Sequence, residues 1–381
     1  MGFLPTAEQR AFTRSLDAML TAADTPAAIR AWGAGDPAPG RAVWARIAEA
    51  GVFALPVPEA YEGVGPLPVE LALAFVELGH HAVPGPLVET VATAALLAEL
   101  ARRGEPAPAK RLLPGLTAGE TPTTWAAPGP SGGAAGGDDG DGAARGRGGR
   151  ERGRGGADRH GEGAERGGGG ADRHGNGPGG LVPHTPYALD ADTAALTCVV
   201  VGDELRIAPG HGPVRASADP ARRLALPAPG GELLAAGPPV VAAAGYAARW
   251  AMLATAAQSL GLGLALLDRT VAYAKQRTQF GTAIGSFQAV KHRLADTLIG
   301  LEFARPLVHG AAVTFKAADL AAAKVAAGEA AYAAARTALQ LHGAVGYTEE
   351  PDLSLWLRKA RPLRDAWGTP SWCRALVLDA T

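Results

Sequence analysis

Residues 277–291, RTQFGTAIGSFQAVK, separate two long runs that are rich in alanine and leucine. The two glycines of this stretch permit backbone conformations with positive φ, which indicates a turn between two helices. The turn carries one guanidinium, Arg277, and two carboxamides, Gln279 and Gln288. An arginine fork suits a phosphate, and a glutamine can bind a ring edge or a ribose. From the residues alone, two interpretations stay open: a nucleotide-binding turn, or a helical hairpin with a solvated polar loop.

The composition favours closely packed helices in two or three domains. The chain has 381 residues, of which 47% are hydrophobic but only 6% are aromatic, and alanine is abundant. The formal net charge of -1 indicates neither a nucleic-acid partner nor a membrane surface. The two cysteines, Cys198 and Cys373, lie far apart in the sequence, so we expect no disulfide framework and a cytoplasmic location.

Neither a signal peptide nor a membrane-spanning segment is expected. The N-terminus leads directly into a polar amphipathic run, in which Thr6 and Gln9 have the spacing of a capping box. The alanine-rich run that starts at Val240 is interrupted by Gly245 and Arg249. The sequence therefore predicts no contact with a membrane.

Three regions of different pattern suggest three domains. Residues 1–118 are predicted to form an N-terminal helical domain, and residues 240–381 a C-terminal helical bundle. Residues 119–239 are predicted to form a reduced β domain with an insertion at 132–180. That insertion consists almost wholly of Gly, Ala, Asp, Glu, Arg and His, and we expect it to be disordered because it cannot bury enough apolar area. The histidines of its tandem repeat are therefore not expected to hold a metal ion.

The hydrophobic periodicity places individual elements within these regions. They are helices at 69–79, 88–102, 240–276, 287–318 and 320–341, and strands at 121–125, 195–201 and 204–208. In the helix that starts at residue 240, Gly261 and Gly263 are expected to let neighbouring helices approach closely.

The pattern R-x-Q-F-G-x-x-I-x-x-F-Q-x-V-K of residues 277–291 resembles the signature of the acyl-CoA dehydrogenase family. Those FAD-dependent enzymes desaturate acyl thioesters between Cα and Cβ. Two further segments resemble the family: residues 50–65, with Glu62 where a glycine is usual, and residues 340–350, with Ala344 replacing a second glycine. The resemblance implies an α+β, mostly α fold with an N-terminal helical domain, a small central β domain and a C-terminal four-helix bundle, associated as a dimer or a dimer of dimers.

The resemblance also implies that this chain contacts FAD across a subunit interface. In the family, the turn and the glycine-rich segment reach the pyrophosphate and the adenosine of the neighbouring subunit's FAD. Carried over to this sequence, these contacts fall on Arg277, Gln279, Phe280, Gln288, Gln340, Leu341, His342, Gly343 and Ala344. FAD is the expected cofactor, and no metal site is expected.

The centre of the chain departs most from the family pattern. Where the family has a T-E-P-x-A-G-S-D motif that packs on the flavin, this sequence reads TTWAAPG at residues 123–129. Trp125 and Tyr187 are candidates for lining the isoalloxazine ring, and ordinary packing is the alternative for both. Because the family motif is missing from this region, the resemblance does not identify which of its residues contact the flavin.

The catalytic base of the family is missing. Desaturation requires a carboxylate beside the thioester to remove the α-proton. Trp367 stands where the family's Y-E-G-T segment has its glutamate, and Ala251 occupies the other position from which family members supply one. Asp365 is a candidate replacement, although its basic surroundings favour a salt bridge with a neighbouring arginine.

Three interpretations follow from a retained FAD-contacting turn and a missing base. The chain is the FAD-completing subunit of a heteromeric acyl-CoA dehydrogenase, a self-sufficient enzyme that uses Asp365 or another group, or a flavin-free scaffolding protein that keeps the fold. The implied partners are an acyl-CoA or carrier-bound acyl thioester, a related subunit in a homo- or hetero-oligomer, and an electron-transfer flavoprotein. Purified protein that is yellow alone, yellow only with a related chain, or never yellow distinguishes the three.

Overall fold

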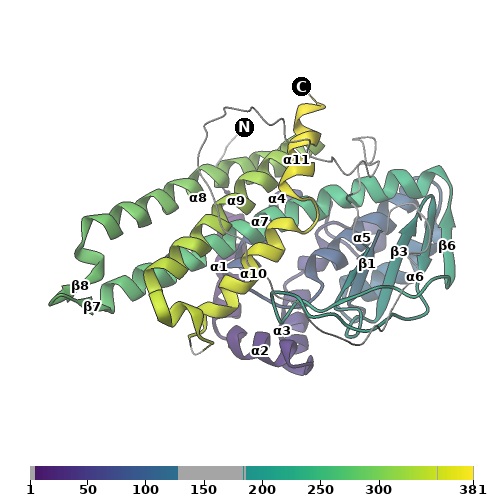
Figure 1. Ribbon diagram of the computed structural model, residues 1–381. Coiled ribbons are helices and arrows are strands. Elements are labelled where there is room, and N and C mark those ends of the chain that lie inside the picture. The colour runs from purple at the N-terminus through teal and green to yellow at the C-terminus, as the bar shows by residue number, and fades with distance from the viewer. Residues whose placement is uncertain (1–4, 128–182, 184–185, 350, 381) are drawn as a thin grey trace, which may run out of the picture. The chain divides into compact units, whose positions relative to one another are not determined.

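A computed structural model of the chain describes residues 5–127, 183, 186–349 and 351–380 (Figure 1). The expected disordered insertion at 132–180 lies outside the described residues. The expected division into three domains stays a prediction, and the elements are given below in chain order.

The N-terminal part of the chain is helical, as expected. Its helices are α1 (Ala7–Thr21), α2 (Thr25–Gly33), α3 (Ala38–Glu49), α4 (Pro68–His80), α5 (Leu87–Arg102) and α6 (Pro106–Thr117). The predicted capping box starts α1: the Gln9 N–H donates to Thr6 Oγ1 at 3.2 Å, and the Thr6 N–H donates to Gln9 Oε1 at 2.8 Å. Helices α2 and α6 had no separate prediction, because short helices rich in proline and glycine give a weak periodic pattern.

The backbone conformation of Glu62 explains why a glycine is usual at this position of the segment 50–65. It closes a short 3₁₀ turn, Glu59–Tyr61, with a φ of 63°, in the left-handed region that side chains other than glycine adopt at a cost. The sequence departs from the family pattern here while the backbone keeps the conformation that glycine favours.

The middle of the chain forms a four-stranded sheet in the order β1-β3-β4-β6. The strands are β1 (Thr123–Ala126), β3 (Leu196–Val201), β4 (Glu204–Ile207) and β6 (Glu232–Ala236), and β2 (Ala188–Leu189) pairs separately with β5 (Leu224–Ala225). Strand β1 runs parallel to β3 with Trp125 opposite Cys198, whereas the other neighbours are antiparallel. The three predicted strands are confirmed, and β6 was missed because its sequence ELLAA favours a helix.

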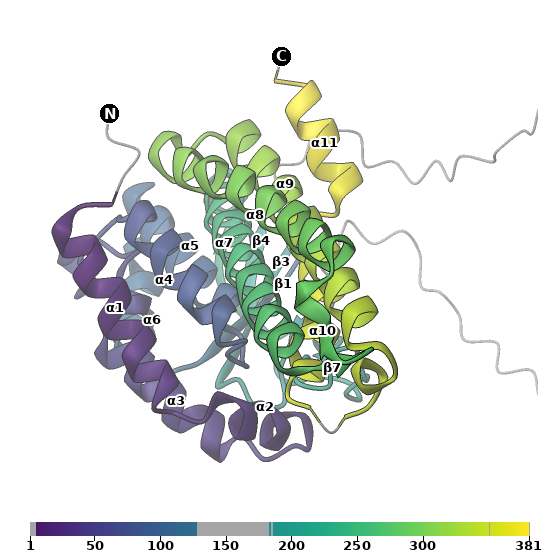
Figure 2. The same ribbon diagram turned by 90° about the vertical axis from the view of Figure 1, so that its left-hand side faces the viewer.

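Five helices follow the sheet, and the longest of them is the core of the fold. They are α7 (Pro238–Gln276), α8 (Gln288–Thr314), α9 (Ala317–His342), α10 (Leu353–Asp365) and α11 (Pro370–Leu378). Helix α7 packs against α4 and α5 on one side and against α8, α9 and α10 on the other (Figure 2). It is long and apolar enough to cross a membrane, but 94% of its most apolar window is buried, which is typical of a core helix. The expected mostly helical α+β architecture is confirmed.

Helix α8 ends four residues earlier than predicted. Phe315 takes a left-handed φ of 51° directly after Thr314 and turns the chain. Its ring then packs against Trp250 and Tyr246, with centroids 5.0 and 5.7 Å away. Tertiary packing of one aromatic side chain therefore overrides a helical pattern that continues to Ala318.

Glycines allow α7 to approach its neighbours closely, as predicted for Gly261 and Gly263. A Cβ atom on Gly261 would lie 1.8 Å from the carbonyl oxygen of Val76 on α4, and one on Gly263 would lie 2.5 Å from Leu301 Cδ2 on α8. Gly79 of α4 makes the reciprocal contact, because a Cβ atom there would lie 2.0 Å from the carbonyl oxygen of Gln258. The α4–α7 contact therefore depends on backbone meeting backbone.

We expect Gly261→Ala to lower the free energy of unfolding by about 2–3 kcal/mol, because the added methyl forces two helix backbones apart. Gly310→Ala is the matched control, since a Cβ atom at Gly310 in α8 meets nothing within 4 Å. The control should be neutral or stabilising by up to about 1 kcal/mol, because alanine is the better helix former. Urea unfolding followed by far-ultraviolet circular dichroism measures both, and equal midpoints for the two variants would contradict the prediction.

Candidate functional site

The turn at residues 277–291 is a short β-hairpin between α7 and α8. Arg277 ends α7 with extended backbone, and β7 (Thr278–Gln279) pairs with β8 (Thr282–Ala283). Phe280 and Gly281 form the tip with φ values of 53° and 77°, as a two-residue hairpin turn with positive φ requires. The hairpin lies at the far end of α7 and α8, where it extends beyond the neighbouring helices (Figure 1).

The side chains of this hairpin face outward. Arg277, Gln279 and Gln288 are exposed, and the Phe280 ring is 94% exposed. Within the part of the chain that the structure describes, no ion pair holds the Arg277 guanidinium. A free guanidinium beside a fully exposed aromatic ring is typical of a surface that contacts another molecule.

The glycine-rich segment that follows α9 offers mainly backbone. Gln340 is exposed, and Gly343 ends the helix with a φ of 60°. His342 points inward: its ring stacks on Tyr273 with centroids 4.0 Å apart, and its Nδ1 lies 2.8 Å from the Ala338 carbonyl oxygen. Burial lowers the pKa of His342. Of the residues in this segment, His342 can therefore contact an external ligand only through its backbone.

A hollow of about 340 Å³ lies between α8 and α9, close to both segments. Arg293 and Arg336 line it together with Asp296 and Thr337. Thr337 precedes Gln340 by about one helical turn, and Arg293 follows Gln288 by less than two turns. Two further guanidiniums therefore stand near the polar residues that the resemblance singled out.

The position of the family's base is filled by the Trp367 indole. Trp367 has a φ of 53° and is followed by Gly368 with a φ of 123°, which turns the chain sharply between α10 and α11. Its Nε1–H donates to Glu89 Oε1 at 3.0 Å, and its ring packs against Trp125 with centroids 4.9 Å apart. Both indoles are buried. Trp367, Trp125 and Glu89 are together called the tryptophan plug below.

The tryptophan plug leaves a cavity of only about 30 Å³. Its lining includes Glu89, Arg222, Gln258, Lys359 and Trp367. This volume holds water, whereas pockets for ligands of drug size measure roughly 300–1,000 Å³. The residues at this position therefore do not fit an isoalloxazine ring with a thioester beside it. Trp125, a candidate for lining the flavin, packs on Trp367 instead.

Buried charges surround this cavity, and the sequence patterns did not single them out. Burial raises the pKa of Glu89, and the nearby Arg222 and the hydrogen bond from Trp367 oppose that rise. Lys359 Nζ and Asp219 Oδ2 form a buried ion pair at 2.8 Å. The available signal was weak: Glu89 is one of two acidic residues in α5, and its partners come from distant parts of the sequence.

A buried lysine on α9 holds the loop that carries Trp367. Lys324 Nζ donates to the carbonyl oxygens of Arg364 at 2.7 Å, Leu363 at 3.3 Å and Gly368 at 3.4 Å. Burial lowers the pKa of Lys324 to about 8. Those three carbonyl groups fix the end of α10 and the following turn, and with them the position of the indole.

The remaining positions that the sequence singled out do not line this cavity. Asp365 is half-exposed, and its Oδ1 lies 3.6 Å from a guanidinium nitrogen of Arg364, so its carboxylate takes part in the expected salt bridge. Ala251 is fully buried in α7 and has no carboxylate, so this position supplies no base. Tyr187 is half-buried beneath the guanidinium of Arg215, 5.6 Å from its ring centroid, and shows ordinary surface packing.

Asp190 provides a pH test of this region. It is fully buried, its Oδ1 accepts the Arg223 N–H at 3.1 Å, and burial raises its pKa from 3.8 to about 7. A raised folded-state pKa means that its stabilising contribution is complete below about pH 4 and is lost as the pH rises to about 7. Asp190→Asn keeps the Oδ1 acceptor and tolerates the left-handed φ of 53°.

We therefore expect Asp190→Asn to remove one component of the pH dependence of stability. Relative to the wild type, the variant should gain roughly 3–4 kcal/mol in the free energy of unfolding between pH 4 and pH 8. Urea unfolding at several pH values measures the difference. Parallel curves for the two proteins over this range would show that Asp190 ionises in the folded state as readily as in the unfolded chain.

Comparison with known proteins identifies the family of this chain. The family profile described as "Acyl-CoA dehydrogenase, N-terminal domain" matches residues 6–120, and "Acyl-CoA dehydrogenase, C-terminal domain" matches residues 242–380. Acyl-CoA dehydrogenase IpdE2 of Mycobacterium tuberculosis is 30% identical over 357 residues, which span 93% of this chain and 91% of that protein. IpdE2 of Mycolicibacterium smegmatis is 41% identical over 120 residues, 32% of this chain and 39% of that protein.

A solved structure supports the fold. One chain of the ChsE4-ChsE5 complex from Mycobacterium tuberculosis superposes with a TM-score of 0.73 at 22% identity, over 100% of this chain and 98% of that chain. The two profiles cover the helical parts on either side of the sheet, which include Glu89, Trp367 and the outward-facing hairpin. A relative that aligns along nearly the whole length, together with two matching profiles, shows that the chain belongs to the acyl-CoA dehydrogenase family.

Proposed function

We propose that this chain is the FAD-completing, base-lacking subunit of a heteromeric acyl-CoA dehydrogenase. The observation that carries the proposal is the tryptophan plug: an indole occupies the position of the base, and the cavity beside it measures about 30 Å³. The hairpin at residues 277–291 meanwhile faces outward, and its Arg277 guanidinium forms no ion pair with any described residue. A chain with a closed pocket and an open FAD-contacting surface suits a supporting role.

FAD is the cofactor of the acyl-CoA dehydrogenase family, in which it accepts the hydride. In the proposed assembly the flavin belongs to a related chain with an open pocket and a glutamate base. The side chains of Arg277, Gln279, Phe280 and Gln288 would hold its diphosphate and adenosine. The segment Gln340, Leu341, His342, Gly343 and Ala344 would add one carboxamide and several backbone groups. Arg293 and Arg336 lie close enough to raise the local positive potential.

The substrate of the assembly is an acyl-CoA or a carrier-bound acyl thioester, and it binds in the partner's pocket. The structure described as the ChsE4-ChsE5 complex, one chain of which has this fold, is a precedent for such a chain in a complex. An electron-transfer flavoprotein is the proposed electron acceptor, and the cytoplasm is the proposed location. This chain supplies no proton transfer, because its plug places no free carboxylate beside a thioester.

Co-expression with a related chain that carries the glutamate base tests the proposal. We expect one FAD for every two chains, and dye-reducing activity with acyl-CoA only in the mixed assembly. A chain that purifies yellow on its own and reduces the dye would support a self-sufficient enzyme, for which Glu89 is a better placed carboxylate than Asp365. Colourless protein with every related chain would support a flavin-free scaffolding protein.

A further inference from the structure

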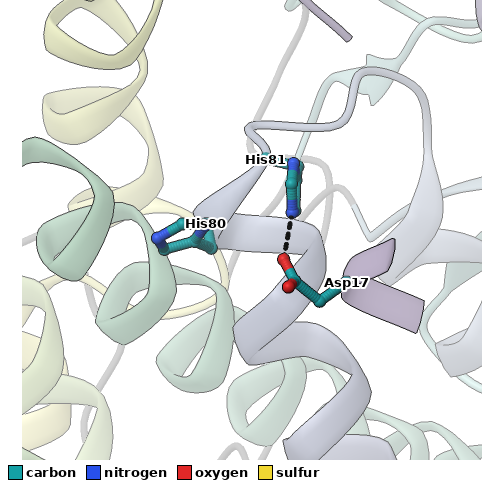
Figure 3. Close-up of side chains that lie close together, drawn as sticks. All are labelled: Asp17, His80 and His81. Atoms are coloured by element: carbon teal, nitrogen blue, oxygen red, sulfur yellow. Dashed lines mark hydrogen bonds and ion pairs between the residues drawn. The ribbon is translucent and has the colours of Figure 1, made fainter. Parts of the chain in front are cut away.

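Two consecutive histidines at the end of α4 lie close to an aspartate of α1 (Figure 3). His80 is the last residue of α4, His81 caps it, and Asp17 lies on α1. Each residue offers one ligand atom, and the three atoms lie within 4.8 Å of one another. Side chains from separate helices therefore gather nitrogen and oxygen donors at one point.

His80 is held in the tautomer that a metal ion requires. Its Nε2 lies 3.3 Å from Asp268 Oδ2 on α7, so this nitrogen carries the proton and donates it to the carboxylate. Its Nδ1 is buried and has no hydrogen-bond partner in the described part of the chain. A histidine that ligates a metal commonly donates its other N–H to a carboxylate in this way. The buried lone pair on Nδ1 otherwise has no favourable contact.

His81 and Asp17 complete the donor set. His81 Nε2 lies 2.8 Å from Asp17 Oδ1, and the two imidazole rings meet edge to face with centroids 5.3 Å apart. The Asp17 side chain is 51% exposed, so an ion can reach the cluster from solvent and keep water as a further ligand.

We propose that Asp17, His80 and His81 form a Zn²⁺ site. Two imidazoles and one carboxylate suit Zn²⁺, whereas Mg²⁺ and Ca²⁺ prefer oxygen ligands alone. Tetrahedral coordination with bonds of about 2.0–2.2 Å places ligand atoms about 3.3–3.5 Å apart. The observed separations, from 2.8 Å to less than 4.8 Å, bracket that value, so side-chain rotations suffice to bind the ion.

Both carboxylates and guanidiniums lie near the cluster. Glu77, one turn earlier on α4, interacts with Asp17, and Asp268 adds a further carboxylate behind His80. Two guanidiniums add positive charge: Arg305 interacts electrostatically with Glu77, and Arg269 with His81. A bound Zn²⁺ would join α1 to α4 and, through the hydrogen bond from His80 to Asp268, would also fix α7. Its role is to anchor the first helix, independently of any flavin.

Metal binding to the full-length chain tests the site directly. After dialysis against a chelator, Zn²⁺ is titrated in competition with a chromophoric zinc indicator, and Co²⁺ is added separately to record its visible absorption. We expect one tight Zn²⁺ per chain, a cobalt spectrum of the intensity typical of four-coordinate sites, and a higher midpoint of thermal unfolding with Zn²⁺. Wild-type protein that binds no Zn²⁺ in this competition would overturn the proposal.

Variants distinguish a metal site from two ordinary ion pairs, His80 with Asp268 and His81 with Asp17. Asp17→Asn and His80→Gln should abolish the cobalt spectrum, and Asp268→Asn, which only orients His80, should weaken Zn²⁺ binding by about 10- to 100-fold. His211→Gln is the control, because His211 is exposed and lies in the sheet region. Binding that survives in Asp17→Asn and His80→Gln, or that is lost equally in His211→Gln, would contradict this site. Circular dichroism confirms that each variant is folded.

Discussion

Arg277→Ala is expected to weaken FAD binding in the mixed assembly by roughly 10- to 100-fold, because a charge-assisted contact to a phosphate contributes about 1.5–3 kcal/mol. The guanidinium stands at the base of the exposed hairpin, with no ion pair to any described residue. Removing it should therefore leave the fold of this chain unchanged. The flavin content of the purified assembly, measured by its absorbance against protein, gives the result.

Two companion variants sharpen this prediction. Arg277→Lys keeps the charge but loses the planar fork, so we expect an intermediate loss of FAD. Arg14→Ala removes an exposed arginine from α1 and should leave flavin content as in the wild type. An unchanged flavin content in Arg277→Ala, with the assembly intact by gel filtration, would contradict the prediction that this turn binds the diphosphate of FAD. Loss of the assembly itself would assign the turn to subunit contact instead.

The long helices and the hairpin were predictable because their signals are local. Helix α7 follows from a long run that is rich in alanine and leucine, and its end follows from the glycines and polar residues of the next fifteen positions. Gly261 was predicted to permit a close approach, and its contact with the Val76 carbonyl oxygen on α4 confirms it. Such positions can be predicted from the sequence, since only glycine lacks the Cβ atom that would prevent the close approach.

The contents of the closed pocket were not predictable in the same way. The sequence indicated that Trp367 replaces a base, but not that its indole pairs with Glu89 from a helix almost 280 positions earlier. Likewise, Lys324 belongs to an alanine-rich helical pattern, and only the fold brings it to the carbonyl groups around Gly368. Contacts between distant segments depend on how helices pack, which no local pattern of residues encodes.

The Asp17–His80–His81 cluster shows the same limit. Asp17 and His80 lie on two helices and are separated by some sixty positions, and an adjacent histidine pair alone does not predict a metal site. An adjacent pair on a helix does not place both side chains on one face. His81 lies beyond the last helical residue, where the chain turns, and that change of direction brings both imidazoles to Asp17.

Trp367→Glu restores the residue type of the family's base, yet we expect it to produce no second active site. The flavin should stay at one per two chains, and turnover per assembly should not increase. The substitution should also lower the free energy of unfolding by about 5 kcal/mol. Loss of a buried tryptophan alone costs about 3–5 kcal/mol, and the new carboxyl group would be buried beside Glu89. Flavin content, dye reduction and urea unfolding measure the three effects.

Glu89→Gln separates this explanation from catalysis by the chain itself. The amide oxygen can still accept the Trp367 Nε1–H, and the ionisation that burial opposes is removed, so the variant should be at least as stable as the wild type near neutral pH. Turnover should also be unchanged, because the proposed base lies on the partner chain. A collapse of turnover in Glu89→Gln, or a second FAD in Trp367→Glu, would instead mean that the pocket behind the tryptophan plug opens and that this chain carries out the desaturation.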